Sequence, residues 1–594
     1  MEYERTSERD AYLNARGCTI LAACPGSGKT TSIVMKLHDL SNYCGNRYGK
    51  HSGFASLSFT NKACDELQEK YLELHDKRIA FPNLVSTIDS FILQKVVLPF
   101  WYLCKLCKKR PIVLNEESLM EKIYYASDDG RKGEYVVPTL GKYSAFIRKI
   151  KPSYVSRDCN GYTLHYKSVK DPSEIDSCKA VFEYRLERGF INSSDALWIA
   201  LEILKCHPEV AKALVCRFPY IISDEAQDNS ELHFAFFDVL RDAGLQDLEF
   251  VGDICQSIYG FNNARPELLQ DRMNSGEWNV LPMTDCRRSN QRIIDLYSKL
   301  KSNDVPRIKS YGVDDRKIPI VVYKYACNNT ATVIDDFNKI CDDHDLKSRK
   351  ILARSISMCK HLSGINDSGF KYWKSELPYL VIGAKHDAQA GDMSSAFRKI
   401  RFVLSELVGG ETIDAKREYL HKIEHDVGIN AEIYNFLEKI PSFSLSFIDW
   451  SQQVCDLLVA HWGLMERPIL AAYEKKKGYS MKIVAKQPVE MYYQSFDKNN
   501  AYYNKVGTIH SVKGASLDGV LLFLSKDSKG QQISLKDFPQ SEIKQMTEKQ
   551  RIIYVACSRA RQFLALAVPV EVPDEQIRQS LAGVDVEIRN AKDN

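Results

Sequence analysis

The stretch Ala23-Cys24-Pro25-Gly26-Ser27-Gly28-Lys29-Thr30 decides the predicted fold. It follows an apolar run at 19–22 that is typical of a buried strand, and it precedes a segment at 31–37 whose apolar residues have helical spacing. A strand, a glycine-rich loop and a helix in this order predict a phosphate-binding loop. Gly26 and Gly28 allow the backbone to curl, so that successive N–H groups point at phosphate oxygens. We expect Lys29 to reach the β- and γ-phosphates and Thr30 to bind Mg²⁺.

Length and composition indicate a soluble, multidomain protein. The 594 residues exceed what one hydrophobic core holds. Lys and Arg number 81 against 77 Asp and Glu, so the net charge of +4 does not by itself indicate nucleic acid, and any basic surface must be local. No run is long and apolar enough to span a membrane, so we expect no membrane partner. The 17 cysteines are scattered singly, which favours a reducing cytoplasm over a disulfide scaffold.

Strands alternate with helices over most of the chain, and this alternation predicts parallel sheets with functional loops at the carboxyl ends of their strands. The alternation is lost twice, in mainly helical stretches. The predicted fold class is therefore α/β, with two parallel-sheet domains that each contain a mainly helical insertion. The predicted boundaries are 1–97 and 190–284 for the first domain, 98–189 for its insertion, 285–384 and 498–594 for the second domain, and 385–497 for its insertion.

Two carboxylates follow the apolar strand predicted at 218–223. We expect Asp224 to hold Mg²⁺ through water and Glu225 to orient and deprotonate the attacking water. Taken alone, the pair is equally consistent with an acidic loop at a helix N-terminus, but a phosphate loop earlier in the chain favours the catalytic interpretation.

A further strand, at 248–252, leads into polar and aromatic residues. Gln256 is expected to sense the γ-phosphate. Tyr259 and Phe261 are expected to stack on bases, since every base has a π-face; the alternative is that both aromatic rings pack in a core.

Cys104 and Cys107 have the Cys-x-x-Cys spacing of some zinc sites, and Cys159, His165 and Cys178 follow. No second Cys-x-x-Cys and no His pair accompanies them. Reduced, unpaired thiols are therefore the preferred interpretation.

Six motifs in chain order resemble those of a superfamily 1 DNA helicase of the UvrD/Rep/PcrA type. They are Gly-Ser-Gly-Lys-Thr at 26–30, Phe-Thr-Asn-Lys-Ala at 59–63, Asp-Glu-Ala-Gln-Asp at 224–228, Gly-Asp-x-x-Gln-Ser-Ile-Tyr-Gly at 252–260, His-Ser-x-Lys-Gly at 510–514 and Tyr-Val-Ala-x-Ser-Arg-Ala at 554–560. The resemblance implies two RecA-like domains with ATP and Mg²⁺ between them. It also implies ATP-driven 3′→5′ movement on single-stranded DNA, or on DNA with a single-stranded tail.

The resemblance also implies roles for individual residues. The nucleotide would be bound by Gly26, Ser27, Gly28, Lys29, Thr30 and Thr31. Hydrolysis would use Glu225, Gln256 and two arginine fingers, Arg287 and Arg559. The implied DNA contacts are Phe59, Thr60, Asn61, Thr87, Tyr259, Phe261 and His510.

Several positions depart from the family pattern. Glu8 stands where the family has an adenine-reading Gln, Thr31 where it has an Arg, and Cys286 where it has a Tyr. These departures predict weak discrimination between nucleotide bases. The second insertion lacks the family's duplex-gripping turn, so translocation is better supported than strand separation.

Two other functions compete with a DNA-dependent ATPase that moves on DNA. One is a regulatory subunit resembling the helicase-like chain of antiphage systems such as Gabija, in which a separate nuclease chain cuts and the ATPase senses DNA ends or nucleotide levels. The other is a nucleotide-gated DNA-binding scaffold without turnover. The presence of Lys29, Glu225, Arg287 and Arg559 argues against the scaffold.

Overall fold

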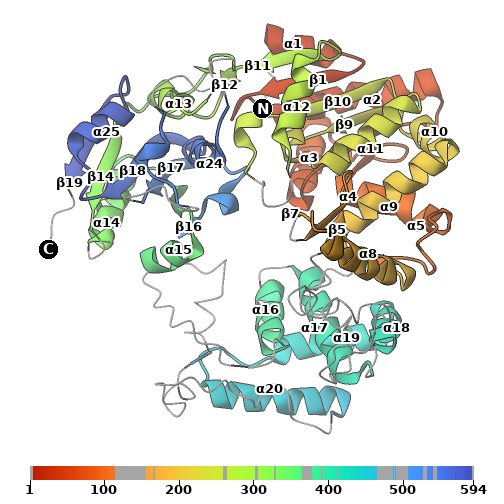
Figure 1. Ribbon diagram of the computed structural model, residues 1–594. Coiled ribbons are helices and arrows are strands. Elements are labelled where there is room, and N and C mark those ends of the chain that lie inside the picture. The colour runs from red at the N-terminus through yellow and green to blue at the C-terminus, as the bar shows by residue number, and fades with distance from the viewer. Residues whose placement is uncertain are drawn as a thin grey trace. The chain divides into compact units, whose positions relative to one another are not determined.

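The computed structural model describes residues 5–113, 155–164, 167–258, 264–301, 305–326, 329–363, 373, 377–389, 392–410, 413–464, 486, 488–489, 506–525, 532–539 and 545–590. The chain forms two compact units. Unit 1 comprises Met1–Ser355 and Gly507–Asn594, and unit 2 comprises Ile356–Val506. Unit 1 contains two six-stranded sheets (Figure 1).

The first sheet is parallel throughout and has the strand order β11-β1-β10-β9-β2-β3. Its strands are β1 (Thr19–Ala23), β2 (Phe54–Ser58), β3 (Leu84–Thr87), β9 (Tyr220–Ser223), β10 (Asp247–Gly252) and β11 (Asn279–Met283). Strands β9 and β10 are buried along their whole length. Burial on both faces suits the apolar run of β9, whereas β10 also buries the carboxylates of Asp247 and Glu249. The predicted parallel sheet is confirmed.

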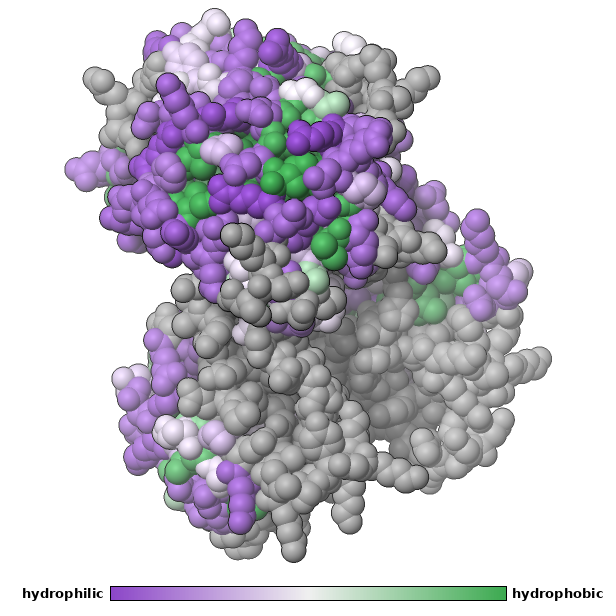
Figure 2. All heavy atoms as spheres, turned by 90° about the vertical axis from the view of Figure 1, so that its left-hand side faces the viewer, coloured by the Kyte–Doolittle hydropathy of each residue, from purple (hydrophilic) through white to green (hydrophobic). Residues whose placement is uncertain are grey.

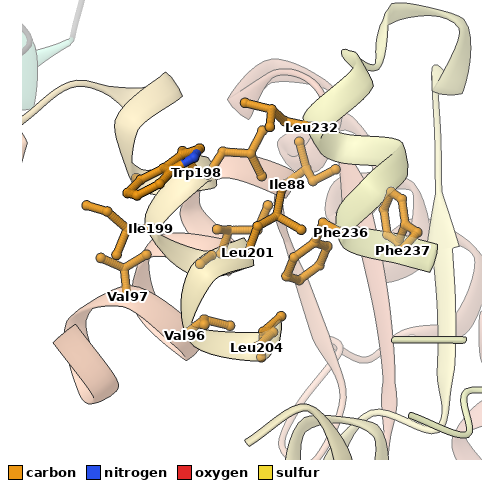
Figure 3. Close-up of a cluster of buried hydrophobic side chains, with 14 of the residues drawn as sticks. Ile88, Val96, Val97, Trp198, Ile199, Leu201, Leu204, Leu232, Phe236 and Phe237 are labelled. Carbon is orange, nitrogen blue, oxygen red and sulfur yellow. The ribbon is translucent and has the colours of Figure 1, made fainter. Parts of the chain in front are cut away.

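Both faces of this sheet are covered, because successive strand residues point to opposite sides. Ile20 and Phe250 belong to one buried cluster, whereas Leu21 and Val251 belong to another. The first cluster includes residues of α9 (Ser193–Cys206) and α11 (Glu231–Asp242), and the second includes residues of α2 (Lys29–Tyr48) and α3 (Asn61–His75). Figure 3 shows part of the first cluster, in which side chains of α9 and α11 meet Val96 and Val97. Further helices of this domain are α1 (Ser7–Asn14), α4 (Ile88–Ile92), α10 (Pro208–Arg217) and α12 (Pro266–Asn274).

The described part of the first insertion contains helices and short strands. The helices are α5 (Leu98–Phe100) and α8 (Pro172–Glu187). Strands β5 (Val155–Arg157), β6 (Tyr162–Leu164) and β7 (Lys167–Ser168) form an antiparallel sheet, and β4 (Ile112–Val113) pairs with β8 (Phe190–Ile191). These strands were not predicted, because two or three residues are too few to display a period of two.

The second sheet has the strand order β16-β15-β17-β18-β14-β19. Its strands are β14 (Ile320–Tyr325), β15 (Arg349–Ala353), β16 (Val506–Thr508), β17 (Leu517–Phe523), β18 (Ala560–Pro569) and β19 (Val586–Asn590). Its helices are α13 (Gln291–Ser298), α14 (Thr330–Asp343), α24 (Glu548–Cys557) and α25 (Asp574–Ser580). The neighbouring pairs β15–β17, β17–β18, β18–β14 and β14–β19 are each parallel, as expected for a second α/β domain.

Unit 2 is helical in its described part. It contains α15 (Ile356–Leu362), α16 (Leu377–Gln389), α17 (Met393–Val408), α18 (Ile413–Glu424), α19 (Val427–Lys439) and α20 (Phe447–Trp462). Trp373 stacks on Phe447 at 4.1 Å between ring centroids, inside a core that also contains Trp450. The predicted insertion at 385–497 lies within this unit, and its bounds stay a prediction.

The surface on the side of α14 and α25 is mainly hydrophilic, with small separate hydrophobic areas (Figure 2). Among the described residues, we find no helix with the length and apolar character needed to span a lipid bilayer.

Candidate active site

The predicted phosphate loop lies between the end of β1 and the start of α2. Gly26 and Gly28 have φ angles of +73° and +87°, which non-glycine residues rarely adopt. No side chain caps the first turn of α2, whose N-cap is Gly28. The N–H groups of that turn therefore lack a side-chain acceptor, and the helix dipole favours an anion there.

The loop contacts a segment that comes from the second α/β domain. The N–H of Arg287 donates to the carbonyl oxygen of Gly26 at 2.8 Å. A Cβ atom at Gly26 would lie 2.4 Å from the Cβ of Arg288, and one at Gly28 would lie 2.5 Å from Nη2 of Arg9. At Gly26 the close approach of Arg288 adds to the positive φ in favouring glycine, whereas at Gly28 the neighbour is the movable end of the Arg9 side chain and the positive φ is the main constraint.

A cleft of about 600 Å³ opens beside the loop and is lined from both sheets. It collects most of the predicted nucleotide-site residues. The lining includes Gly26, Ser27, Gly28, Lys29, Thr30, Thr31, Asp224, Glu225 and Gln256 from the first domain, and Arg287, Arg288, Lys513, Ser516, Arg559 and Arg561 from the second.

The two predicted catalytic carboxylates follow β9 directly. The N–H of Asp224 donates to the carbonyl oxygen of Leu57 at 2.8 Å, which fixes the loop to β2. Glu225 has a φ of +52°, a strained conformation for a residue with a side chain. Its Oε1 lies 3.5 Å from Nζ of Lys29, and its Oε2 accepts a hydrogen bond from Nε2 of Gln227 at 2.5 Å. These contacts aim the Glu225 carboxylate toward the phosphate-loop lysine.

The charges in the cleft shift one another's pKa values. Burial and the neighbouring Glu225 carboxylate raise the pKa of Asp224. Burial acts the same way on Glu225, but Lys29 and Lys513 outweigh it and hold its pKa below the usual range. Burial opposes the charged form of Lys29, yet Glu225, Asp224 and Asp253 keep its pKa above the ordinary value. Glu225 therefore stays ionised, as a base for water must.

A series of hydrogen bonds crosses the cleft. Gln227 accepts from the N–H of Asp253 at 3.0 Å, and Gln256 donates to Oδ2 of Asp253 at 2.7 Å. Nη2 of Arg559 then donates to Oε1 of Gln256 at 2.6 Å. Arg559 is 2% exposed, and its pKa falls to about 9 because of burial and the nearby Arg288. This series links the catalytic loop of the first domain to an arginine of the second.

A second link across the cleft is an ion pair between Asp228 and Lys513. The carboxylate is nearly fully buried, and burial raises the pKa of Asp228 to about 6. Sequence reasoning assigned no role to Gln227, Asp228 or Lys513, although each lies inside a motif. The signal in the sequence that could have pointed to these three residues was their position inside the motifs.

Comparison with known proteins finds similarity to a family of helicases. Residues 5–275 match the model of the UvrD/REP helicase N-terminal domain. The chain is therefore similar to the UvrD-like proteins of superfamily 1, and the matched model covers a little less than half of it. It is 23% identical to an ATP-dependent DNA helicase Rep of Buchnera aphidicola subsp. Schizaphis graminum over 57% of this chain, and the matched part spans only 50% of that relative. It is 21% identical to the putative ATP-dependent DNA helicase YjcD of Bacillus subtilis over 95% of this chain and 78% of the relative. Exonuclease/helicase subunit RexA of Lactococcus lactis is 28% identical over 27% of this chain and 13% of its own length.

The predicted DNA contacts lie at strand ends of both sheets. Phe59, Thr60 and Asn61 follow β2, and Thr87 ends the neighbouring β3. The hydroxyls of Thr60 and Thr87 each cap a helix, accepting from the N–H of Ala63 and Ser90 at 3.2 Å. The structure brings these residues to one edge of the first sheet.

His510 lies in a 3-10 helix after β16, and its Nε2 is 3.3 Å from the carbonyl oxygen of Ile258. Burial and the neighbouring Arg354 lower the pKa of His510, so the ring is neutral near pH 7. Tyr259 and Phe261 lie outside the described residues.

Two of the three positions that depart from the UvrD-like pattern, Glu8 and Cys286, are engaged within the protein. The carboxylate of Glu8 accepts from the N–H of Thr284 at 2.8 Å and from its hydroxyl at 2.7 Å. The Cys286 side chain is fully buried, with its sulfur 4.0 Å from the hydroxyl of Tyr297.

Cys104 and Cys107, the suggested zinc ligands, are buried. Within the described part of the chain, no group of three or more His, Cys, Asp or Glu side chains has the arrangement of a metal site, and His165 lies outside that part.

Proposed function

We propose that this chain is an ATP-dependent motor that moves 3′→5′ along single-stranded DNA. One observation carries the proposal: the hydrogen-bonded series from Glu225 through Gln227, Asp253 and Gln256 to Arg559 joins the two sheets beside the phosphate loop. A change at the γ-phosphate would be transmitted along this series to the second domain. Opening and closing of a cleft between two domains is a common way to couple nucleotide hydrolysis to movement.

The residues of the cleft fit ATP and Mg²⁺. Thr30 and Asp224 offer hydroxyl and carboxylate oxygens, the donor types that Mg²⁺ prefers. The pKa of Asp224 is raised by burial and by Glu225, so a cation there would relieve an unfavourable carboxylate charge. When bound there, Mg²⁺ would supply positive charge that offsets the negative charge of the phosphates.

The side chains of this chain would share the remaining work of hydrolysis. Lys29 holds the terminal phosphates, and Glu225 takes a proton from the attacking water. Gln256 senses the γ-phosphate, and Arg287 and Arg559 stabilise the negative charge that develops on it. The strand-end residues Phe59, Thr60, Asn61, Thr87 and His510 would hold the DNA strand, with Tyr259 and Phe261 stacking on its bases.

The proposal is tested by ATP hydrolysis of the purified chain with and without single-stranded DNA. The wild type should be stimulated by DNA. Glu225→Gln should bind ATP without hydrolysing it, because water activation is lost while the phosphate contacts remain. Lys29→Ala should lose nucleotide binding, and Glu209→Gln, at an exposed site on α10, should behave as wild type. Retained turnover in Glu225→Gln would contradict the assignment of the base.

Movement and its polarity need a separate measurement. Displacement of streptavidin from biotin at the 5′ end of an oligonucleotide, and not from biotin at the 3′ end, is the expected result for 3′→5′ movement. Alanine at Tyr259 or Phe261 should weaken single-strand binding by about 1–3 kcal/mol and leave basal hydrolysis intact. Loss of basal hydrolysis with unchanged DNA affinity would show that these rings are core residues.

A second candidate function is a DNA- or nucleotide-sensing ATPase subunit that regulates a separate nuclease in cytoplasmic antiphage defence. It is favoured by the similarity to RexA, whose name describes an exonuclease/helicase subunit. Such a sensor should hydrolyse ATP at DNA ends without displacing streptavidin from either end. The displacement assay therefore separates the two candidates.

A further inference from the structure

A polar pocket of about 410 Å³ lies between the small antiparallel sheet of the first insertion and the first domain. No role has been assigned to it so far. Six hydroxyl side chains and two arginines line it, together with Phe59, one of the predicted DNA contacts. The hydroxyl residues are Ser156, Thr163, Ser168, Ser193, Ser194 and Ser230, and the arginines are Arg157 and Arg265.

Arg157, on β5, is one of the two arginines of this pocket, and its guanidinium group stacks on aromatic rings. Its guanidinium carbon lies 4.7 Å from the centroid of the Trp198 ring and 5.2 Å from that of the Tyr162 ring. Trp198 is itself fixed in the apolar cluster of Figure 3. The side chain of Arg157 forms no hydrogen bond or ion pair with any described residue. Stacking thus holds the planar group in place while its N–H donors lack acceptors.

The other charged groups of the pocket have partners within the protein. Asp89 lies 3.1 Å from Nε2 of His233, and Glu231 lies 3.8 Å from Arg265. Asp158 accepts a hydrogen bond from the N–H of Asn160 at 2.9 Å. Of the two arginines that line the pocket, Arg157 is the one without a carboxylate partner among the described residues, and hydroxyl groups that also bond phosphate oxygens line the pocket with it.

We propose that Arg157 binds a phosphate of the single DNA strand, so that the insertion holds the strand against the first domain. The inference rests on the proposed function. The pocket is continuous with the predicted DNA path, because Phe59 lines it and Asp89, which also lines it, comes two residues after Thr87. A guanidinium fork matches phosphate geometry and carries no base preference, so the contact positions the strand without reading its sequence.

The test is the salt dependence of oligo(dT) binding to the full chain, followed by fluorescence anisotropy. Each phosphate contact on a single strand contributes about 0.7 to the slope of log K against log salt concentration. Arg157→Gln should reduce that slope by about 0.7 and weaken binding about tenfold, as for one lost charge-assisted hydrogen bond. Arg157→Lys should keep the slope, because the charge remains.

The matched control is Arg47→Gln. Arg47 also stacks on two rings, those of Tyr43 and Tyr48, but it lies on α2 and does not line the pocket. The slope of log K against log salt concentration for Arg47→Gln should equal that of the wild type. An unchanged slope in Arg157→Gln, an equal loss in Arg47→Gln, or a loss in Arg157→Lys as large as in Arg157→Gln would each overturn the proposal.

Two further measurements distinguish a phosphate of DNA from a free phosphate ion and from a phosphate of RNA. Calorimetry with inorganic phosphate should show no site that depends on Arg157, and a site lost in Arg157→Gln with unchanged DNA binding would mean that the pocket takes a free anion. A slope change with oligo(rU) but none with oligo(dT) would assign the contact to RNA. Wild-type protein that does not bind oligo(dT) would contradict the proposed function itself, whereas normal wild-type binding with an unaffected Arg157→Gln would contradict this inference alone.

Discussion

Charged side chains from both sheets meet at the phosphate end of the cleft, whereas the end expected to face the base is built from groups already bonded inside the protein. At the first end, Lys29 lies 3.5 Å from Glu225, and Arg559 contacts Gln256 at 2.6 Å. At the other end, both oxygens of Glu8 accept hydrogen bonds from Thr284, and Cys286 is fully buried.

This difference indicates which part of a nucleotide the site recognises. The phosphate end offers charged groups and hydrogen-bond donors that come from two domains. The base end offers little that is not already used within the fold. We infer that nucleotide binding depends on the triphosphate and Mg²⁺, and that the base contributes little.

The largest expected effect is at Arg559. Arg559→Ala should reduce kcat by about 10³–10⁵, the range found for arginine fingers in phosphoryl transfer. The physical reason is the loss of a buried positive charge beside the developing γ-phosphate charge. Steady-state ATPase assays measure this effect, and Arg589→Ala, on β19, serves as a control that should leave kcat unchanged. A fall of less than tenfold in Arg559→Ala would show that the phosphate end does not depend on this residue.

The next effect concerns the ion pair between Asp228 and Lys513. Its side chains are 1% and 10% exposed, and removing one partner of a buried pair costs about 3–5 kcal/mol. Lys513→Met should lower the free energy of unfolding by that amount, as measured by urea denaturation. The double variant with Asp228→Asn should lose less than the two single losses together.

The matched control for this pair is Lys62→Met, which removes a partner of Glu66 in an exposed pair at 3.9 Å. Its cost should be at most about 1 kcal/mol. Equal costs at the two pairs would show that the buried link does not stabilise the phosphate end.

A smaller effect is expected when a side chain that can stack on the base is introduced at the base end of the cleft. Thr31 lines the cleft directly after the phosphate loop. Thr31→Arg introduces a guanidinium for the base to stack on, which is worth about 1–3 kcal/mol per stacked base. ATP binding should therefore tighten, and a fluorescent ATP analogue would measure it. Thr31→Gln, of similar length without the charge, is the control, and equal tightening by both would exclude stacking as the cause.

The smallest effect is expected for Glu8→Gln. Both Glu8 oxygens are held by Thr284, so the substitution should leave the KM for ATP nearly unchanged and cost about 1 kcal/mol in stability through a weaker hydrogen bond. Steady-state kinetics of Glu8→Gln measures the KM for ATP, and unfolding of the same variant measures its stability. A large decrease in KM with unchanged stability would mean that the residue at this position does read the base.

The sequence was sufficient for those parts of the site that are local in the chain. Gly26, Gly28 and Lys29 form one loop, and Asp224 and Glu225 follow one apolar strand, so spacing alone predicted their neighbourhood. The links between domains were not predictable from spacing. Arg559 and Gln256 are 303 residues apart, and Lys513 and Asp228 are 285 residues apart. Only folding brings such pairs together.

Other features were missed because their signals are short or ambiguous. The strands β5 to β7 contain two or three residues each, too few for a detectable alternation. The hydroxyls of Thr60 and Thr87 cap helices. Any Thr that precedes a helix can cap it, and capping does not exclude a DNA contact. The placement of the Arg157 guanidinium depends on rings that come from two different elements, β6 and α9.

The most direct test of the phosphate-centred account is the comparison of kcat/KM for ATP, GTP, CTP and UTP in the presence of single-stranded DNA. Recognition through phosphates predicts that all four values lie within about tenfold of one another, a difference of roughly 1.4 kcal/mol. A hundredfold preference for ATP over the other three nucleotides would contradict the account.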